Sequence, residues 1–428
     1  MTRRLYLFDD GEARKWHPFA LTRPAGELLF GALLLRERIE RALGLAVAGT
    51  LAPPGLEDFE EKGAPSALVP DEVEDGIRIL VCARWIPPIS GGGGVAPTIQ
   101  LPVDLPRQGV RLTVEGRTMG WVLPQGTPLP PTSSLLAPSS DDGRPGFSLP
   151  GRLLTSPWEL MAENAEQTSR DLEHLFPRGE GPGGEALGPV PGVHRLGPHP
   201  VSVGADVHLD PGTVLDTRDG PIHLARGVRV RAFTHLRGPA VIGPGSTLLG
   251  GVLEHLSCGP VCKLRGEVHA SVILGYSNKA HDGYLGHAVL GRWVNLGAMT
   301  TNSDLKNNYG PVRIPTGPDS VHDTGLMKVG VFLGDHVKTG IGTLLTTGTV
   351  VGAGSNVFGG PMPPRWVPPF SWGSGSDLAP YRLEAFLETA EKAMGRRDVP
   401  MTPRLRSCLT TAWQLASREH DPEGGREA

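Results

Sequence analysis

The chain has 428 residues and a formal net charge of −4, and a chain of this length can form two or three domains. The nearly balanced charge gives no reason to expect nucleic acid or an anionic membrane as a partner. Glycine (59 residues) and proline (42) are abundant, while aromatic residues make up 6%. This composition favours tight turns and short strands over large helical cores.

The four cysteines, Cys82, Cys258, Cys262 and Cys408, are too few for a disulfide framework in a chain of this length. Cys258 and Cys262, in the segment CGPVC, are either two small buried thiols or metal ligands, and the sequence leaves both readings open. No stretch approaches the ~20 apolar residues of a spanning helix, and the N-terminus lacks the apolar run of a signal peptide. We therefore expect a cytoplasmic protein.

Residues 1–176 have the pattern of an α/β domain. LYLFDD (5–10) reads as a short strand that ends in Asp9 and Asp10, and residues 77–87 read as a second buried strand. Apolar residues at helical spacing predict a helix over 26–44 and another over 156–176. The glycine- and proline-rich residues 177–199 that follow are expected to be a linker.

From residue 200 to 376 the sequence has a period of six, as in VFLGDH-VKTGIG-TLLTTG-TVVGAG-SNVFGG (331–360). A six-residue period is typical of a parallel β-helix, in which stacked triangular coils bury one continuous aliphatic core. A sandwich of short strands is the alternative, but its strands lack so short a period. Residues 377–428 contain two amphipathic helical patterns, which we expect to cap the open end of the coil.

The segments NKAH (278–281), YLG (284–286), VNLGAMT (294–300) and TNSD (301–304) resemble, in order and spacing, the acetyltransferase domain of one enzyme family. This is the bifunctional glucosamine-1-phosphate acetyltransferase/UDP-N-acetylglucosamine pyrophosphorylase family. The resemblance implies a left-handed parallel β-helix, acetyl-CoA as a substrate and a homotrimer that holds the coenzyme between subunits.

A divergent bacterial branch of that family, described as sugar nucleotidyltransferases, resembles this chain over a longer stretch. The shared segments are GEVHAS, GYSNKAHDGYLGH, LGAMTTNSDLKNNYGPV, LGDH and TGTVVG. The resemblance extends from about residue 1 to residue 397.

The resemblance also implies residue roles in the β-helix. His281 matches the general base, a role that suits an imidazole because it titrates near neutral pH. Tyr284 and Asn295 match residues that orient the reacting groups. Lys279, Arg265 and His269 are the candidates for the sugar phosphate. The candidates for the acetyl-CoA side are Asn302, Ala298, Lys306 and Asp335.

The N-terminal segment FDDGEARKWHPFALTRP (8–24) resembles the phosphate-binding start of a sugar nucleotidyltransferase. Arg14 falls at the loop arginine and Arg23 at the arginine of the RP pair, and both are candidates for binding the substrate. Asp9 and Asp10 are the candidates for Mg²⁺, which a nucleoside triphosphate would need. Because Ala25 stands in place of the expected lysine and only Gly11 remains of the glycines, we expect weak nucleotidyl transfer.

The sequence thus predicts acetyl transfer from acetyl-CoA to an amino sugar phosphate, glucosamine 1-phosphate or a close relative. Nucleotidyl transfer to a sugar 1-phosphate is a possible second activity of the N-terminal domain. One alternative is a carbonic anhydrase-like enzyme on the same β-helix, with zinc held by His281, His287 and His322. The other is a regulatory protein that binds sugar nucleotides and has an inactive N-terminal domain.

Overall fold

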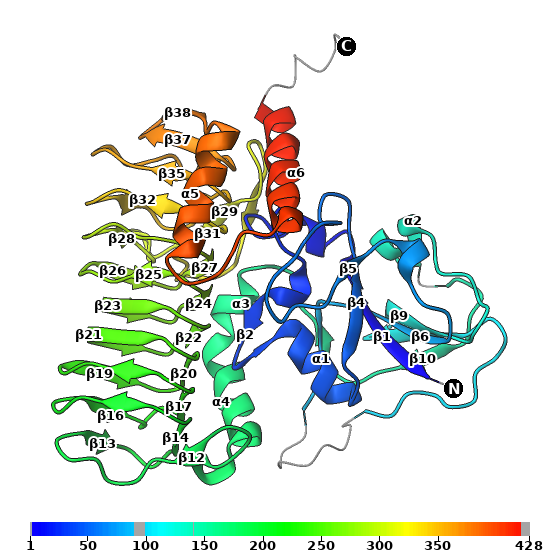
Figure 1. Ribbon diagram of the computed structural model, residues 1–428, viewed down its shortest axis with the longest axis horizontal. Helices are drawn as coiled ribbons and strands as arrows, with labels where there is room; N and C mark the ends of the chain where they lie inside the picture. The colour runs from blue at the N-terminus through cyan, green and yellow to red at the C-terminus, as the bar shows by residue number, and fades with distance from the viewer. Residues whose placement is uncertain (1, 90–98, 140, 421–428) are drawn as a thin grey trace.

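The computed structural model describes residues 2–89, 99–139 and 141–420. An α/β domain lies beside a long stack of short strands, and the last two helices lie at the far end of that stack (Figure 1). The fold class expected from the sequence is confirmed: an α/β domain, a left-handed parallel β-helix and a helical C-terminal cap.

A seven-stranded sheet forms the centre of the N-terminal domain, with the order β10-β8-β9-β6-β1-β4-β5. Its bounds in that order are Gly146–Ser148, Val110–Val114, Arg117–Leu123, Ile77–Cys82, Arg3–Phe8, Val47–Leu51 and Ala67–Leu68. β1 pairs in parallel with both β4 and β6, and its residues Leu5 to Phe8 are buried. An unbroken apolar run is typical of a parallel strand that is covered on both faces.

The helix expected over residues 26–44 forms only in its second half. Residues 29–34 instead form a hairpin of β2 (Leu29–Phe30) and β3 (Leu33–Leu34), and α1 (Leu35–Leu43) then ends at Gly44. Gly31 has φ 65°, and its N–H donates to Asn164 Oδ1 at 3.1 Å. This left-handed turn, which suits glycine, interrupts the helical pattern.

The rest of the N-terminal domain consists of short helices and a second hairpin. The helix expected over 156–176 divides into α3 and α4, and a second hairpin pairs β7 with β11. Their bounds, with those of α2, are α2 (Thr132–Leu136), α3 (Glu159–Ala162), α4 (Asn164–Leu175), β7 (Trp85–Ile86) and β11 (Arg152–Leu153).

The expected linker over 177–199 is partly wrong, because two of its segments belong to the β-helix. β12 (Glu185–Ala186) pairs antiparallel with β14, and β13 (His194–Leu196) pairs in parallel with β16. The first coil therefore begins before residue 200. Its glycine- and proline-rich turns resemble a linker in composition, but they connect short edge strands.

The β-helix has three faces. The first face contains β14 (Val201–Val203), β17 (Ile222–Leu224), β20 (Ala240–Ile242), β22 (Ser257–Cys258), β24 (Val272–Gly275), β27 (Val289–Arg292), β31 (Val331–Leu333), β34 (Thr349–Val351) and β36 (Trp366–Val367). The second contains β15 (His208–Leu209), β18 (Arg229–Val230), the first halves of β21 (Thr247–Glu254) and β23 (Lys263–His269), β25 (Asn278–Lys279), β32 (Lys338–Thr339), β35 (Asn356–Val357) and β37 (Ser371–Ser374).

The third face contains β13, β16 (Val214–Asp216), β19 (Thr234–Arg237), the second halves of β21 and β23, β26 (Tyr284–Gly286), β28 (Thr301–Asn302) and β33 (Leu344–Leu345). Leu215, Leu236 and Leu253 point inward from successive coils of this face and are fully buried. Between β28 and β31 the chain leaves the coil and forms the hairpin β29 (Arg313–Pro315) and β30 (Val321–Asp323).

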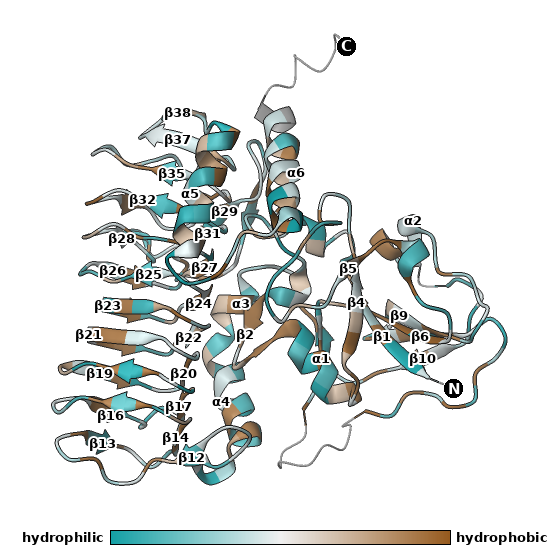
Figure 2. Cartoon of the chain, viewed as in Figure 1, coloured by the Kyte–Doolittle hydropathy of each residue, from teal (hydrophilic) through white to brown (hydrophobic). Residues whose placement is uncertain are grey.

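The N-terminal domain covers the first face of the β-helix. Phe19 and Phe30 pack in one apolar cluster with Leu274, Val289 and Phe332 from β24, β27 and β31. Figure 2 shows β2 as a hydrophobic segment between α1 and the β-helix. The part of the first face formed by β24, β27 and β31 is therefore not available to a ligand.

The C-terminal tail joins the upper coils to the N-terminal domain. After β38 (Asp377–Pro380), α5 (Leu383–Gly395) packs Phe386 on Phe370, and α6 (Pro403–His420) adds Leu409 to the same cluster. On another side of α6, Cys408 contacts Leu56 and Phe59 of the N-terminal domain. Among the described residues, no helix has the length and apolar character to cross a bilayer.

Candidate functional site

A pocket of about 680 Å³ opens on the second face, where the C-terminal end of α5 meets the coils. His281, Asn295 and Ala298 line it, so the structure brings together three of the residues expected to act in acetyl transfer. The other lining residues used below are Lys263, Tyr276, Asn278, Trp293, Lys338, Ile341, Arg396 and Arg397.

The floor of the pocket is a vertical row of polar side chains. Lys263, Asn278, Asn295 and Lys338 occupy the same register position in successive coils, and such positions point outward because their neighbours fill the core. Asn278 Nδ2 donates to Asn295 Oδ1 at 3.2 Å, and Arg397 Nη2 of the α5 end donates to Asn278 Oδ1 at 2.7 Å. The end of α5 is thereby tied to the coils.

Aromatic side chains form one wall of the pocket. The rings of Tyr276 and Trp293 stack with centroids 4.3 Å apart, and His336 continues the column at 6.1 Å from Trp293. All three residues are at corners of the coil, with φ values of 53°, 64° and 61°. A stacked aromatic edge next to an open pocket can receive a planar heterocycle.

The pocket is electropositive. Lys263, Lys338, Arg396 and Arg397 line it, and none of the described lining residues is a carboxylate. Burial lowers the pKa of Lys338 to about 8, so this lysine remains mostly charged at neutral pH. Such a site is suited to a ligand with several phosphate oxygens.

His281 lies at the rim of this pocket with an exposed side chain. Its carbonyl oxygen accepts a bond from Lys279 Nζ at 2.5 Å, and the same Nζ donates to the carbonyl oxygen of Arg265 at 2.9 Å. Lys279 is 2% exposed, and burial lowers its pKa to about 8. Lys279, expected to bind the sugar phosphate, instead supports the turn that presents His281.

Several expected residues lie outside the pocket and bind the chain itself. Asn302 is buried, with Oδ1 accepting from Gly286 N–H at 3.0 Å and Nδ2 donating to the Gly286 carbonyl at 3.0 Å. Lys306 Nζ donates to the Pro311 carbonyl at 3.0 Å. Arg265 Nε lies 3.1 Å from Asp282 Oδ1. These contacts do not support the coenzyme and substrate roles expected for them.

Tyr284 and His269 lie on the third face, around the corner from the pocket. Tyr284 Oη donates to Asp304 Oδ2 at 2.6 Å, and the ring of His269 lies 5.1 Å from that of His287. Tyr284 therefore does not share one pocket with His281 within a single chain.

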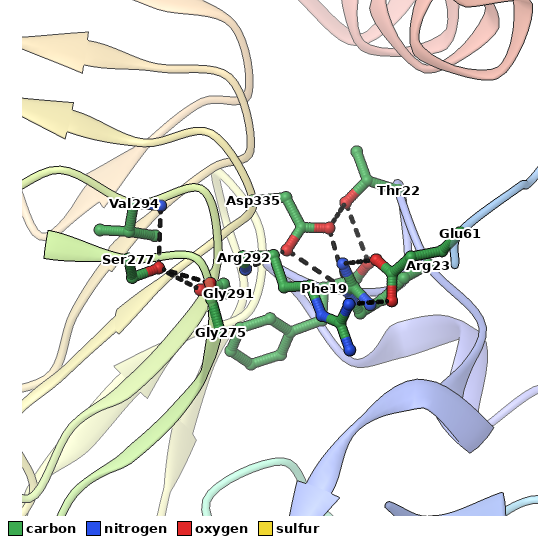
Figure 3. A network of polar contacts seen from close by, with 10 residues as sticks. All are labelled: Phe19, Thr22, Arg23, Glu61, Gly275, Ser277, Gly291, Arg292, Val294 and Asp335. Atoms are coloured by element: carbon green, nitrogen blue, oxygen red, sulfur yellow. Dashed lines mark hydrogen bonds and ion pairs between the residues drawn. The ribbon is translucent and has the colours of Figure 1, made fainter. Parts of the chain in front are cut away.

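Asp335 and Arg23 form the polar centre of the domain interface, where neither can contact a coenzyme or a phosphate (Figure 3). Arg23 Nε donates to Asp335 Oδ2 at 3.0 Å, and its Nη2 pairs with Glu61 at 3.0 Å. The same Asp335 accepts from Thr22 Oγ1 at 2.9 Å and from the Arg292 N–H at 2.7 Å. Both side chains are almost fully buried, so the expected roles of Asp335 and Arg23 are replaced by a structural one.

The expected Mg²⁺ ligands are also engaged. Asp10 pairs with Arg84, whose Nε is 2.8 Å from Asp10 Oδ1, and Asp9 accepts from the Ala25 N–H at 3.0 Å. Burial raises the pKa of Asp9 to about 6, which opposes the charge a metal ligand needs. Arg14 Nη1 donates to the Ala20 carbonyl at 2.7 Å. These residues do not fit an Mg²⁺ site, and no step is assigned to that ion.

A second pocket, of about 610 Å³, lies in the N-terminal domain between the β7 region and α4. Arg38, Arg152, Arg170 and His174 line it together with Asp171. Arg38 forms a fully buried pair with Asp171, with Nη1 and Oδ1 2.7 Å apart. The sequence pattern did not indicate this pocket, because its arginines come from two helices and a short strand, α1, α4 and β11, without a phosphate-binding motif.

Neither of the proposed metal sites is seen. Cys258 and Cys262 are buried in the β-helix core, as expected for two small thiols. His287 Nδ1 bonds Asp304 Oδ2 at 2.7 Å, and His322 lies against Trp158 with centroids 6.3 Å apart. Within residues 2–89, 99–139 and 141–420, no three His, Cys, Asp or Glu side chains could hold one ion.

Sequence reasoning missed Asn278, Trp293, Lys338 and Arg397 as pocket residues. The six-residue period could have identified Asn278 and Lys338, because both share the register of Asn295. Arg397 could not be found in this way, since its place depends on how α5 docks.

Comparison with known proteins adds a family match for the first domain. Residues 5–178 match the family described as sugar nucleotidyl transferase. The chain is 33% identical over 94 residues to a bifunctional sugar-1-phosphate nucleotidylyltransferase/acetyltransferase of Sulfurisphaera tokodaii, covering 22% of this chain and 23% of that protein. It is 30% identical over 182 residues to the bifunctional protein GlmU of Paraburkholderia xenovorans, covering 36% and 38%.

These alignments span between about a fifth and two fifths of the relatives' length. Among solved structures, an Arabidopsis UDP-N-acetylglucosamine acyltransferase aligns with 52% of this chain and 94% of its own, at 11% identity and a TM-score of 0.27. By sequence, residues 5–178 are similar to sugar nucleotidyl transferases, and parts of the chain are similar to bifunctional sugar-nucleotide enzymes.

Proposed function

We propose that this chain is a divergent relative of the two-activity enzymes that make sugar nucleotides. In this proposal, its β-helix transfers an acetyl group from acetyl-CoA to the amino group of an amino sugar phosphate such as glucosamine 1-phosphate. The single observation that supports this most is the electropositive second-face pocket, which combines His281, Asn295 and Ala298 with stacked aromatic rings.

The pocket chemistry suits the coenzyme. Lys263, Lys338, Arg396 and Arg397 would bind its phosphates, and the Tyr276–Trp293 edge would receive its adenine ring. Acetyl-CoA supplies the thioester. His281 at the rim would take a proton from the attacking amine, and Asn295 would orient the acceptor.

The same proposal includes a homotrimer. Phe233, Met299 and Ile341 occupy one corner of the prism in different coils and are 84%, 56% and 80% exposed. Exposed apolar side chains along one edge are typical of an interface, and Ile341 also lines the pocket. A neighbouring subunit on this edge would cover its open side. Light scattering should give three times the chain mass of 45.4 kDa, and a monomer at micromolar concentration would contradict the trimer.

For the N-terminal domain we propose binding of a sugar 1-phosphate and a nucleoside triphosphate, in keeping with the family matched by residues 5–178. Because Arg23, Asp9 and Asp10 are buried and engaged within the protein, we propose the second pocket as the place for these phosphates. Arg152 and Arg170 there are more exposed, and they would exchange their pairs with Glu159, Glu163 and Glu166 for the phosphates. Nucleotidyl transfer should then be weak compared with acetyl transfer.

The proposed function is tested with the purified full chain, acetyl-CoA and a panel of amino sugar phosphates, by following release of the coenzyme thiol. We expect acceptor-dependent thiol release that is lost in His281→Ala. Absence of thiol release with every amine, in a chain that is folded and binds acetyl-CoA, would contradict it.

A further inference from the structure

A hydrogen-bonded Tyr–Asp–His cluster lies on the third face, separate from the second-face pocket. Asp304 Oδ2 accepts from Tyr284 Oη at 2.6 Å and contacts His287 Nδ1 at 2.7 Å. Burial raises the pKa of Asp304, but the bonds from His287 and Tyr284 outweigh it and lower the pKa to about 2. Asp304 is therefore ionised and accepts the Nδ1 proton of His287.

A carboxylate at Nδ1 decides what the other nitrogen can do. It holds the neutral imidazole in the tautomer with its proton on Nδ1, which leaves the Nε2 lone pair available to accept a proton. Within the described chain, no hydrogen bond to Nε2 of His287 is seen, and the side chain is 14% exposed. The arrangement is that of a general base with a free Nε2 lone pair.

The coil fixes this geometry. Tyr284 is the first residue of β26 and His287 follows its last, while Asp304 follows β28 in the next coil. The buried Asn302 amide bonds both the N–H and the carbonyl of Gly286, which locks residues 284–287 against 302–304. Asn302 is thus a positioning residue for the cluster, which explains its burial.

The surroundings of His287 contain charged and titratable groups from several coils. They are Tyr284, Asp304, His269, His255, Glu254, Glu267 and Lys328. The rings of His255, His269 and His287 form a column with centroid distances of 5.5 and 5.1 Å, and burial with the neighbouring His287 lowers the pKa of His269. Asp304, Glu254 and Glu267 bring carboxylates to this face, which the second-face pocket lacks, and Lys328 and Arg237, which lies 3.7 Å from Glu254, offset part of their charge.

The proposed acetyl transfer needs such a site, because an aliphatic amine enters as an ammonium ion at neutral pH. It must lose one proton to become a nucleophile and a second as the N–C bond forms. The leaving thiolate takes back only one of them, so one proton is released to water. A single base at His281 accounts for the second proton but not for the first.

We propose that the Tyr284–His287–Asp304 cluster is a second proton-transfer site, which binds the ammonium group of the acceptor and takes its first proton on His287 Nε2. Because the cluster does not share one pocket with His281 within a single chain, it would act with the second-face pocket of a neighbouring subunit in the proposed trimer. The free amine then attacks the thioester carbon, the N–C bond forms and the C–S bond breaks. The second proton passes to His281 and from it to the thiolate, while His287 returns its proton to water at the exposed face. This inference rests on the proposed function, and it requires an acceptor whose amino group is protonated when it binds.

The test compares pH profiles of thiol release from acetyl-CoA and glucosamine 1-phosphate, in the full chain. At pH 7, His287→Gln should lower kcat/KM about 100-fold, because its amide can still bond Asp304 but cannot take a proton. At pH 9.5 the acceptor is already a free amine, so the loss should shrink to about threefold. Asp304→Asn should show the same pattern with a smaller loss.

His281→Ala and His255→Gln serve as the matched comparisons. The first should lose activity at both pH values and the second at neither. A loss in His287→Gln of equal size at both pH values, or full activity at pH 7, would overturn the second site while leaving acetyl transfer in place. An inactive wild-type chain would overturn the proposed function and this inference with it.

Discussion

Charged residues have opposite environments in two regions of this molecule. In the N-terminal domain Arg23 contacts two carboxylates, Asp335 and Glu61, and all three are in the domain interface. On the second face of the β-helix, Lys338 and Arg396 border an open pocket without a carboxylate. A charged residue that is already paired inside the protein stabilises the fold, whereas one left unpaired at a pocket can bind a ligand.

The largest expected effect tests the second-face pocket. His281→Ala should lower kcat for acetyl transfer by about 10²–10⁴-fold, the usual contribution of a general base, with an unchanged unfolding midpoint. His208→Ala is the control, because His208 is an exposed histidine on the second face of a distant coil, in register with Asn278 and away from the pocket. Equal activity of the two variants would contradict the role of His281.

The domain interface is tested by removing one member of the Arg23–Asp335 ion pair. Asp335→Ala leaves Arg23 buried with one carboxylate and should lower the free energy of unfolding by about 3–5 kcal/mol. Denaturant unfolding measures this, with Asp319→Ala as the control, since Asp319 is exposed. If Asp335→Ala instead raises the KM for acetyl-CoA at unchanged stability, the coenzyme role expected from the sequence would be restored.

A smaller effect concerns the end of α5. Arg397→Ala removes a cation from the pocket and the bond to Asn278, and it should raise the KM for acetyl-CoA about tenfold. Lys392→Ala, on the same helix but outside the pocket and paired with Glu388, should leave KM unchanged. Steady-state kinetics at varied acetyl-CoA separates the two, and an unchanged KM in Arg397→Ala would place the coenzyme elsewhere.

The smallest effect is a dependence on pH. Burial lowers the pKa of Lys338 to about 8, so its positive charge is present below that pH and lost above it. The KM for acetyl-CoA should therefore rise severalfold between pH 7 and pH 9, by roughly the amount one phosphate contact contributes. Lys338→Arg keeps its charge over this range and should show no such rise. A parallel rise in both proteins would assign the effect to another group.

The fold was largely predictable because the six-residue period results from a physical requirement, the stacking of coils over one aliphatic core. The sequence patterns predicted the wrong local structure in two segments where contacts with other parts of the chain determine the conformation. The helical pattern of 26–44 gives way to a hairpin at Gly31, which Asn164 binds from far along the chain. The composition of 177–199 gave no sign that β12 and β13 pair with distant strands.

The candidate site was only partly predictable. The motifs place His281 on one coil and Asn295 and Ala298 on the next, and their meeting in one pocket follows from the period. Whether Asp335 faces a coenzyme or Arg23 depends on how the two domains dock, which a local motif does not record. The bond between His287 and Asp304 likewise appears only once β26 and β28 are stacked.

The central claim is that the β-helix contains the open catalytic site, while the N-terminal motif residues are engaged within the protein. Arg23 bonds across the domain interface, and Asp9, Asp10 and Arg14 bond within their own domain. The most direct measurement assays one preparation of the full chain side by side for two products. These are coenzyme thiol from acetyl-CoA with glucosamine 1-phosphate, and pyrophosphate from a nucleoside triphosphate with a sugar 1-phosphate and Mg²⁺. The account predicts rapid thiol release and little pyrophosphate release. Robust pyrophosphate release without thiol release, abolished by Asp9→Asn or Asp10→Asn in a folded protein, would contradict it.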